Sequence, residues 1–327
     1  MATTIARELA HSVDTIDFVK VTESAALAAS RWMGRGERNT ADGAAVERMR
    51  EALNAMEISG RIVIGEGERD EAPMLYIGEE VGRGGYEVDI AVDPVEGTNL
   101  VANGLPNSIA VMAIGERGSL LNAPDTYMKK LAVGAKAASY VHIDAPVREN
   151  LEAVAHALEK AINEITVVIL DRPRHAELIR EVRDTGARIK LISDGDVDSC
   201  IATAVQGTGI HVAMGTGGAP EGVLAAAALK CLGGMFMGKL EPRNAQEADR
   251  ARAMGVNDFS RVLTMDDLVK GRQLLFCATG ITDGDLTRGV RFFGNHARTH
   301  SIVMHGDGTL RFVESVHRLG ARPMPIG

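Results

Sequence analysis

The stretch Tyr86-Glu87-Val88-Asp89-Ile90-Ala91-Val92-Asp93-Pro94-Val95-Glu96-Gly97-Thr98 sets the architecture of the first half of this chain. Its first eight residues alternate larger apolar side chains with acidic or small ones, and a period of two is typical of a β-strand. Pro94 should end that strand, because proline has no backbone N–H to donate to a neighbouring strand. Gly97 lets the backbone turn into a helix. The pattern therefore predicts a strand, an acidic turn and a helix.

The turn carries two carboxylates, Asp93 and Glu96, three residues apart. They would repel one another unless a cation lay between them, and Mg²⁺ or Mn²⁺ prefers oxygen ligands of this kind. The alternative is an acidic turn whose carboxylates are solvated or cap the next helix. The pattern alone leaves both interpretations open.

A helix is expected before this strand. Asn39 or Thr40 can cap its start, which places Asp42 in the first turn. Its buried face is marked by apolar residues at spacings of three and four: Val46, Met49, Leu53 and Met56. The helix therefore brings a third carboxylate to its first turn.

A short apolar strand over residues 61–64 is expected to end at Gly65, so that Glu66 emerges at its carboxyl end. Further acids follow, and the charge run from Glu68 to Glu71 matches a solvated surface. Glu66 differs from that run because two glycines flank it and an apolar strand precedes it.

The second half repeats the order strand, loop, helix. Strands are expected over 165–170, 188–193 and 210–214, and helices are expected to begin near Pro173, after Asp196 and near Glu221. Such a repeat is typical of a parallel sheet with helices packed on it.

The C-terminal region returns to a strand pattern. Residues 299–304 and 309–313 are expected to form a hairpin around Asp307-Gly308. A length of 327 residues favours two domains. We place their division near residue 164, with a mixed α+β domain over 1–164 and an α/β domain over 165–327.

The composition, with 45% hydrophobic and 24% charged residues, is that of a globular protein. A net charge of -8 argues against a nucleic-acid-binding surface. No apolar run is long enough to span a membrane, and the N-terminus does not resemble a secretory signal, so a cytoplasmic protein is expected. The three cysteines, Cys200, Cys231 and Cys277, are too widely spaced to indicate a metal site and are expected to be buried.

Two further motifs have two interpretations each. The glycine-rich run at 215–222 could form a nest of backbone N–H groups for a phosphate, or be an ordinary loop. Arg172-Pro173-Arg174-His175 places cationic side chains after a strand end, where they bind a phosphate or are solvated. A dinucleotide fingerprint is not matched, because the glycine spacing is broken.

The sequence lacks the motifs of several other enzyme classes. There is no G-x-S-x-G elbow, no P-loop and no histidine pair at the spacing of a zinc helix. Asp194-Gly195-Asp196 is not followed by the threonine that phosphatases of the haloacid type require. Carboxylates, glycines and a hydroxyl remain, and this set suits metal-assisted hydrolysis of a phosphate ester.

The motifs resemble those of class II fructose-1,6-bisphosphatase, within the lithium-sensitive, metal-dependent sugar and inositol phosphatases. The similarity extends from about Val21 to Val316. It is carried by Asp93 to Thr98 together with Thr40-Ala41-Asp42-Gly43-Ala44-Ala45, Ile64 to Glu68, Asp70 to Leu75, Ala123 to Lys130, Asp171 to His175, Ile192 to Asp196 and Ala219 to Gly222.

The resemblance implies roles for the matching positions. The family's metal ligands, for Mg²⁺ or Mn²⁺, match Asp42, Glu66, Asp93, Glu96 and Glu221, with the carbonyl of Val95 as a further candidate. Thr98, Glu66 and Asp93 would be catalytic, with Thr98 orienting or deprotonating the attacking water. Substrate binding falls on Glu96, Gly97, Thr98, Tyr127, Arg172, Pro173, Arg174, Asp194, Gly195, Asp196 and Gly218.

The chemistry of these side chains suggests which part of the substrate each one binds. The two arginines suit the phosphate that is not cleaved, and Asp194 and Asp196 can accept hydrogen bonds from sugar hydroxyls. Lys129 and Lys130 either add positive charge beside Tyr127 or are solvated surface lysines.

The implied fold is the layered αβαβα sandwich of these phosphatases. The implied activity is hydrolysis of the 1-phosphate of fructose 1,6-bisphosphate in gluconeogenesis. The alternatives are an enzyme that also hydrolyses sedoheptulose 1,7-bisphosphate, and a non-catalytic sensor of sugar phosphates or cations. The family is usually oligomeric, so a homodimer or homotetramer is expected. The expected partner is a small sugar bisphosphate, and binding to nucleic acid or to a membrane is not expected.

Overall fold

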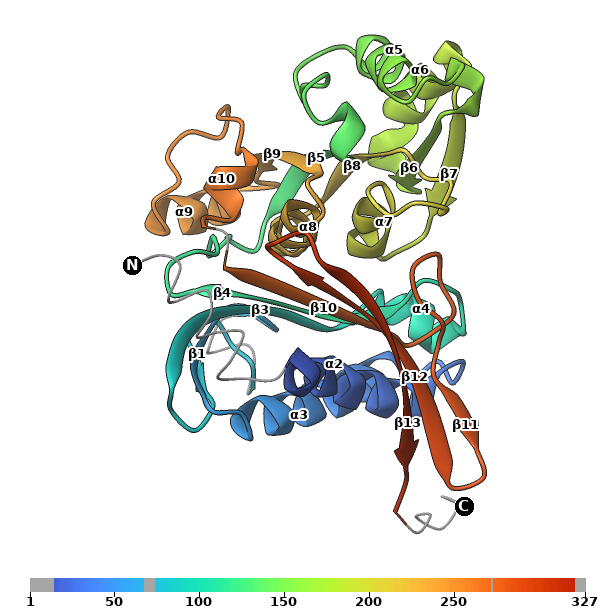
Figure 1. The fold of residues 1–327 in the computed structure, drawn as a ribbon. Helices are drawn as coiled ribbons and strands as arrows, with labels where there is room; N and C mark the ends of the chain where they lie inside the picture. The colour runs from blue at the N-terminus through green and yellow to red at the C-terminus, as the bar shows by residue number, and fades with distance from the viewer. Residues whose placement is uncertain (1–14, 68–73, 272, 321–327) are drawn as a thin grey trace.

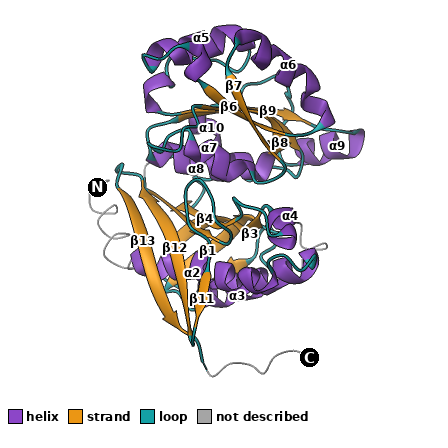
Figure 2. Ribbon diagram, turned by 90° about the vertical axis from the view of Figure 1, so that its right-hand side faces the viewer, coloured by secondary structure: helices purple, strands orange, loops and turns teal. Residues whose placement is uncertain are grey.

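A computed structural model describes residues 15–67, 74–271 and 273–320. Two β-sheets alternate with three layers of helices (Figures 1 and 2). Each sheet and helix buries an apolar face against its neighbour, which gives three clusters of buried side chains. The predicted layered α/β sandwich is confirmed.

The first sheet has the strand order β11-β12-β10-β4-β3-β1-β2, and β13 pairs with β12. Its strands are β1 (Ile58–Ile64), β2 (Glu80–Val81), β3 (Tyr86–Glu96), β4 (Ile109–Glu116), β10 (Leu274–Gly280), β11 (Arg291–Phe293), β12 (His296–His305) and β13 (Leu310–Arg318). The β12–β13 hairpin is confirmed at its predicted turn, where the Gly308 N–H donates to the His305 carbonyl at 2.9 Å.

The second sheet has the order β7-β6-β8-β5-β9. Its strands are β5 (Tyr127–Val133), β6 (Thr166–Leu170), β7 (Arg188–Ile192), β8 (Val212–Gly218) and β9 (Met235–Glu241). The expected parallel pairing holds for β6 with β7 and β8. It fails at β5, which is antiparallel to both of its neighbours, so the sheet is mixed.

The helices cover both faces of each sheet. Helices α2 (Thr15–Ala29) and α3 (Arg38–Asn54) cover the outer face of the first sheet, and α5 (Val147–Ala157) and α6 (Ala176–Thr185) the outer face of the second (Figure 2). The layer between the sheets holds α7 (Asp196–Ala202) and α8 (Ala219–Cys231). The shorter helices are α4 (Thr98–Asn103), α9 (Ala245–Ala253) and α10 (Met265–Leu268), with 3₁₀ turns at Ser30–Trp32, Ala135–Ala137, Ile162–Glu164 and Pro173–His175.

Helix α8 lies between the two sheets and packs against both (Figure 1). Ten of its thirteen residues are buried. A helix that is apolar on all sides is stable in water only when it is surrounded by protein. It therefore fixes the two sheets relative to one another and carries Glu221 in its first turn.

The expected division at residue 164 does not coincide with the division between the sheets. Strand β5 already belongs to the second sheet, and β10 to β13 belong to the first. The chain therefore leaves the first sheet after β4 and returns to it at β10.

The helix expected to start at Asn39 or Thr40 begins at Arg38, after Glu37, whose side chain makes no capping hydrogen bond. Asp42 consequently lies in the second turn of the helix and not in its first. Among the described residues, no helix is both long and apolar enough to cross a membrane.

Candidate active site

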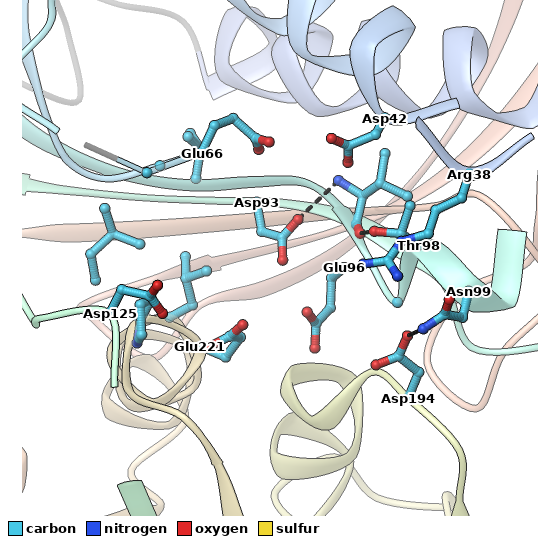
Figure 3. Close-up of a pocket in the computed structure, with 18 of the residues that line it drawn as sticks. Arg38, Asp42, Glu66, Asp93, Glu96, Thr98, Asn99, Asp125, Asp194 and Glu221 are labelled. Atoms are coloured by element: carbon cyan, nitrogen blue, oxygen red, sulfur yellow. Dashed lines mark hydrogen bonds between the residues drawn. The ribbon is translucent and has the colours of Figure 1, made fainter. Parts of the chain in front are cut away.

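A cavity of about 440 Å³ lies among α3, the ends of β1 and β3, α4 and the start of α8 (Figure 3). The five carboxylates expected to bind metal all line it: Asp42, Glu66, Asp93, Glu96 and Glu221. They come from α3, the end of β1, β3 and α8. The fold thus gathers acids that are separated by up to 179 residues in the sequence.

A β-bulge delivers two of these acids to the cavity. Strand β3 continues through Pro94 to Glu96, which corrects the expectation that the strand ends at the proline. The pairing with β4 shifts between Asp93 and Glu96, so one extra residue is accommodated there. Proline is tolerated in a bulge because its missing N–H interrupts no ladder bond.

Asp93, Glu96 and Glu221 form the tightest group of acids. Each offers a carboxylate oxygen within 4.8 Å of the other two. Asp42 and Glu66 lie on the other side of Asp93 (Figure 3). The arrangement supports the metal-binding interpretation of the acidic turn, although Asp93 also accepts a hydrogen bond from the Val95 N–H at 3.0 Å.

The protonation of these acids reflects burial and mutual repulsion. Burial, followed by the nearby charges of Asp42 and Asp93, raises the pKa of Glu66 to about 9. Burial also raises the pKa of Asp93 to about 7, and it raises those of Asp42, Glu96 and Glu221 above their ordinary values. Without a cation the group therefore binds protons that free carboxylates would release.

The donor set fits a hard divalent cation. It consists of carboxylate oxygens, and the Oε2 atom of Glu221 is buried with no hydrogen-bond partner among the described residues. An orphaned buried oxygen costs free energy unless a proton or a cation satisfies it.

Thr98 stands at the start of α4, directly beside the acids. Its hydroxyl donates to the Val95 carbonyl at 3.1 Å. Gly97 precedes it with a φ of 80°, which glycine adopts at little cost. The predicted turn from strand to helix is confirmed at this position.

The loop before α7 reaches the cavity from the second sheet. The side-chain amide of Asn99 donates to Asp194 at 2.9 Å, as Figure 3 shows. The Val197 N–H donates to Glu96 Oε1 at 2.9 Å. Asp194 lines the cavity, and Gly195 follows it as the N-cap of α7 with a φ of 78°.

Asp196 does not line the main cavity but forms an ion pair with the buried Lys130. The Lys130 Nζ lies 2.6 Å from its Oδ2. Burial lowers the pKa of Lys130, but attraction to Asp196 and Glu221 outweighs it and leaves that pKa above its ordinary value. The solvated alternative is wrong for Lys130, whereas Lys129 is exposed.

The glycine run at 215–218 is part of β8 and pairs with β5, so these residues form neither the nest nor the ordinary loop that the sequence left open. Gly217 is required for a different reason. A Cβ there would lie 2.2 Å from Asp196 Oδ2 and 3.1 Å from Lys130 Nζ. The glycine leaves space for that ion pair.

The remaining substrate-binding candidates lie outside the main cavity. Gly218 pairs with Tyr127 across β8 and β5. Arg174 contacts the Tyr127 ring and, like Arg172, belongs to the segment that follows β6. Pro173 opens the 3₁₀ turn in that segment. The structure thus places these residues at the start of β5 and at the carboxyl ends of β6 and β8.

The cavity also contains residues that the sequence patterns did not single out. Arg38, Asn99 and Asp125 line it. The place of Asn99 in the cavity could have been predicted locally, because Asn99 directly follows Thr98. The position of Arg38 depends on the packing of α3 against the first sheet, which no local pattern shows. The three cysteines are buried and unbonded, as expected.

The family model described as bacterial fructose-1,6-bisphosphatase, glpX-encoded, matches residues 13–317. Three relatives are named D-fructose 1,6-bisphosphatase class 2/sedoheptulose 1,7-bisphosphatase. The protein of Synechococcus sp. (strain JA-3-3Ab) is 49% identical over 92% of this chain and 94% of the relative. That of Trichodesmium erythraeum (strain IMS101) is 50% identical over 93% and 96%, and that of Microcystis aeruginosa (strain NIES-843 / IAM M-2473) is 51% identical over 92% and 95%. A match over nearly the whole chain, together with a cavity that gathers the acids of a metal-dependent phosphatase, shows that the chain belongs to the glpX-encoded class II fructose-1,6-bisphosphatases.

Proposed function

We propose that the protein hydrolyses the 1-phosphate of fructose 1,6-bisphosphate to give fructose 6-phosphate and phosphate, with Mg²⁺ or Mn²⁺ in the acidic cavity. The observation that supports this most directly is the meeting of five carboxylates and the Thr98 hydroxyl in one cavity. The family is one of phosphatases, and the acidic group supplies the ligands that its metal dependence requires.

Asp42, Glu66, Asp93, Glu96 and Glu221 would hold the cations. Bound there, divalent cations neutralise phosphate oxygens and lower the pKa of water, which is the chemistry such ions supply. Because burial keeps these carboxylates partly protonated when no cation is present, metal binding displaces protons from them.

Thr98 would orient the attacking water. Its hydroxyl hydrogen is committed to the Val95 carbonyl, so the lone pairs of Oγ1 are left to accept a hydrogen bond from water. A water held in this way presents its own lone pair to the phosphorus atom. The contribution of Thr98 therefore falls mainly in the transition state.

The second sheet would hold the rest of the substrate. Asn99 fixes the Asp194 carboxylate at the edge of the cavity, where it can accept from a sugar hydroxyl. Asp196 is fixed by Lys130. Tyr127 begins β5 of this sheet, Arg172 and Arg174 follow its strand β6, and all three suit the phosphate that is not cleaved.

The names of the three relatives favour a second activity, on sedoheptulose 1,7-bisphosphate, because each name states both bisphosphatases. The two sugars share their phosphate ends, so the residues of the cavity do not separate them. A homo-oligomer working in the cytoplasm also remains part of the proposal. The sensor alternative would require the loss of a metal ligand or of Thr98, and the cavity retains all of them.

The proposal is tested by phosphate release from fructose 1,6-bisphosphate and sedoheptulose 1,7-bisphosphate, each with Mg²⁺, Mn²⁺ or chelator. Inositol 1-phosphate serves as the control substrate. Metal-dependent release from the first sugar alone supports a single-substrate enzyme, and comparable release from both supports the dual enzyme. No release under any metal from folded protein overturns the proposal in favour of the sensor.

A further inference from the structure

The ring of Tyr127 lies against two guanidinium groups. The Cζ atom of Arg174 is 4.6 Å from the ring centroid, and that of Arg243 is 4.5 Å from it. Tyr127 begins β5 and pairs with Gly218 of β8 and Glu241 of β9. Arg243 is brought to the ring because it follows β9 by two residues. Two segments far apart in the sequence thus bring cations to one aromatic side chain.

Both guanidinium groups are held from one side. Arg174 donates from Nε and Nη2 to the Thr216 carbonyl at 3.0 and 2.6 Å. Arg243 donates from Nε to Glu247 Oε1 at 2.6 Å, and its Nη2 lies 2.5 Å from the same oxygen. Within residues 15–67, 74–271 and 273–320, Arg174 makes no ion pair, and the ion pair of Arg243 is the one with Glu247. The two guanidinium groups are therefore fixed in place beside the Tyr127 ring.

Glu247, the partner of Arg243, is itself fixed. It is 6% exposed, accepts from the Thr126 hydroxyl at 3.0 Å and accepts from the Arg243 N–H at 2.8 Å. Its own N–H donates to Asn244, the N-cap of α9. Arg243 is thus anchored to a buried carboxylate and is not a freely moving surface side chain.

The arginine pair lies beside the acidic cavity. Asp125, which lines the cavity, is two residues before Tyr127. Gly218, the strand partner of Tyr127, is three residues before Glu221. A substrate with its reacting phosphate at the acids would therefore extend along β5 toward the two arginines.

We propose that Arg243 is a specificity-determining residue that binds the phosphate that is not cleaved, together with Arg174, and so favours sugar bisphosphates over monophosphates. The inference rests on the proposed function. An arginine fork suits phosphate oxygens, and one that is already oriented loses little freedom on binding. Tyr127 and Glu247 hold the fork in position before the substrate arrives.

The test compares Arg243→Met with Arg252→Met. Arg252 is a matched control on α9, because it pairs with Asp249 at 2.7 Å and lies 5.5 Å from the Phe259 ring. The KM for fructose 1,6-bisphosphate should rise roughly 10- to 100-fold in Arg243→Met, the range expected for losing a charge-assisted hydrogen bond. The inhibition constant of fructose 6-phosphate should rise by a similar factor, because this product keeps only the phosphate that is not cleaved.

Fructose 1-phosphate separates specificity from general damage. It lacks the second phosphate, so its KM should change by less than about threefold in Arg243→Met. Arg243→Lys keeps the charge but not the planar fork. Its KM for fructose 1,6-bisphosphate and its inhibition constant for fructose 6-phosphate should fall between those of Arg243→Met and wild type. Thermal unfolding of each variant shows whether the loss of the Glu247 partner has disturbed the fold.

An equal rise in KM for fructose 1,6-bisphosphate and fructose 1-phosphate would overturn the role of Arg243. So would a rise in Arg252→Met equal to that in Arg243→Met. So would an unchanged inhibition constant for fructose 6-phosphate. The wild-type protein tests the proposed function separately, through its metal-dependent phosphate release. Calorimetric binding of fructose 6-phosphate to wild type and Arg243→Met tests the arginine even if no turnover is seen, and equal affinities would again contradict the inference.

Discussion

The Glu96 carboxylate accepts a hydrogen bond from the Val197 N–H at 2.9 Å. Glu96 ends β3 of the first sheet, and Val197 lies in the first turn of α7, which follows the second sheet's strand β7. One oxygen of the acidic group is therefore bonded to the segment proposed to bind the sugar. If Glu96 binds metal as proposed, metal binding and the position of α7 are coupled through this single side chain.

Two substitutions of Glu96 separate its charge from its hydrogen bond. Burial, followed by repulsion from Asp93 and Asp196, holds the pKa of Glu96 well above its ordinary value. Glu96→Gln keeps an acceptor for Val197 and removes the charge, so metal-free Glu96→Gln should be more stable than wild type at pH 8. Glu96→Ala should be less stable than Glu96→Gln by about 1 to 3 kcal/mol, because the Val197 N–H loses its acceptor. Urea unfolding with chelator measures both, and a Glu96→Gln variant less stable than wild type would contradict the argument.

The metal-free protein should lose stability as the pH rises. The pKa is raised to about 7 for Asp93 and to about 9 for Glu66, against ordinary values of 3.8 and 4.5. Between about pH 4 and 9 the native state therefore binds more protons than the unfolded state, and its stability falls through that window. Saturating Mg²⁺ or Mn²⁺ should reverse this loss, so the rise in Tm on adding metal should be larger at pH 8.5 than at pH 6.

Sodium chloride at matched ionic strength is the control for that measurement, because it screens charges without occupying a carboxylate site. An equal rise in Tm at both pH values would mean that metal binding does not depend on displacing these protons.

Thr98→Ala should lower kcat by about 100-fold or more and leave KM within about threefold of wild type, because a group that orients the attacking water acts mainly in the transition state. Thr98→Ser keeps a hydroxyl that can donate to the Val95 carbonyl and should retain most of the activity. Steady-state kinetics with saturating metal compare the three proteins. A Thr98→Ala enzyme with nearly wild-type kcat would remove the hydroxyl from the reaction.

The acidic turn could be predicted from sequence because its signals are local. The alternation before Asp93 marks β3, and Gly97 marks the turn into α4. The expectation that β3 ends at Pro94 is wrong because a bulge lets the strand continue. A bulge depends on the register with β4, and the register is set by the partner strand. The charge run from Glu68 to Glu71 lies outside the described residues, which omit 68–73.

Other features depend on contacts between distant segments. Lys130 is buried because Asp196, 66 residues later, supplies a counter-charge. The place of β5 in the second sheet is decided by β8 and β9, both of which follow it by more than 75 residues. The run at 215–218 has the composition of a loop, but its pairing with β5 keeps it extended. Pairings between distant segments cannot be predicted from a local sequence pattern.

Gly217→Ala should disturb the ion pair between Asp196 and Lys130, beside the proposed sugar site. The new methyl group would meet Asp196 Oδ2 at 2.2 Å, so that carboxylate must move away from Lys130. We expect a loss of about 1 to 3 kcal/mol in stability and a higher KM. Gly43→Ala is the matched control, because a Cβ at this exposed helical position meets nothing within 4 Å and should stabilise the protein by about 0.5 to 1 kcal/mol. Urea unfolding compares the two, and equal effects would show that the Asp196 contact is unimportant.

Asp198 should reduce stability at high pH. It is fully buried in α7, and neither carboxylate oxygen has a hydrogen-bond partner among the described residues. Burial, followed by repulsion from Asp285, raises its pKa to about 7 from an ordinary 3.8. The native state therefore keeps a proton that the unfolded state releases, and stability is lost between about pH 4 and 7. At 1.36 kcal/mol for each pH unit, this loss amounts to at most about 4 kcal/mol.

Asp198→Asn removes this titration, so its stability relative to wild type should increase by up to about 4 kcal/mol between pH 4 and pH 8. The quantity compared is the change with pH in the stability difference between Asp198→Asn and wild type. A cost of burying the asparagine amide that does not depend on pH therefore cancels. Asp307→Asn is a control of opposite sign, because hydrogen bonds from the backbone and side chain of Thr309 hold the pKa of Asp307 below its ordinary value. Wild type gains stability from Asp307 as the pH rises, so Asp307→Asn should become relatively less stable. Urea unfolding with chelator at four pH values measures all three proteins, and parallel curves for wild type and Asp198→Asn would show that Asp198 is not protonated in the native state.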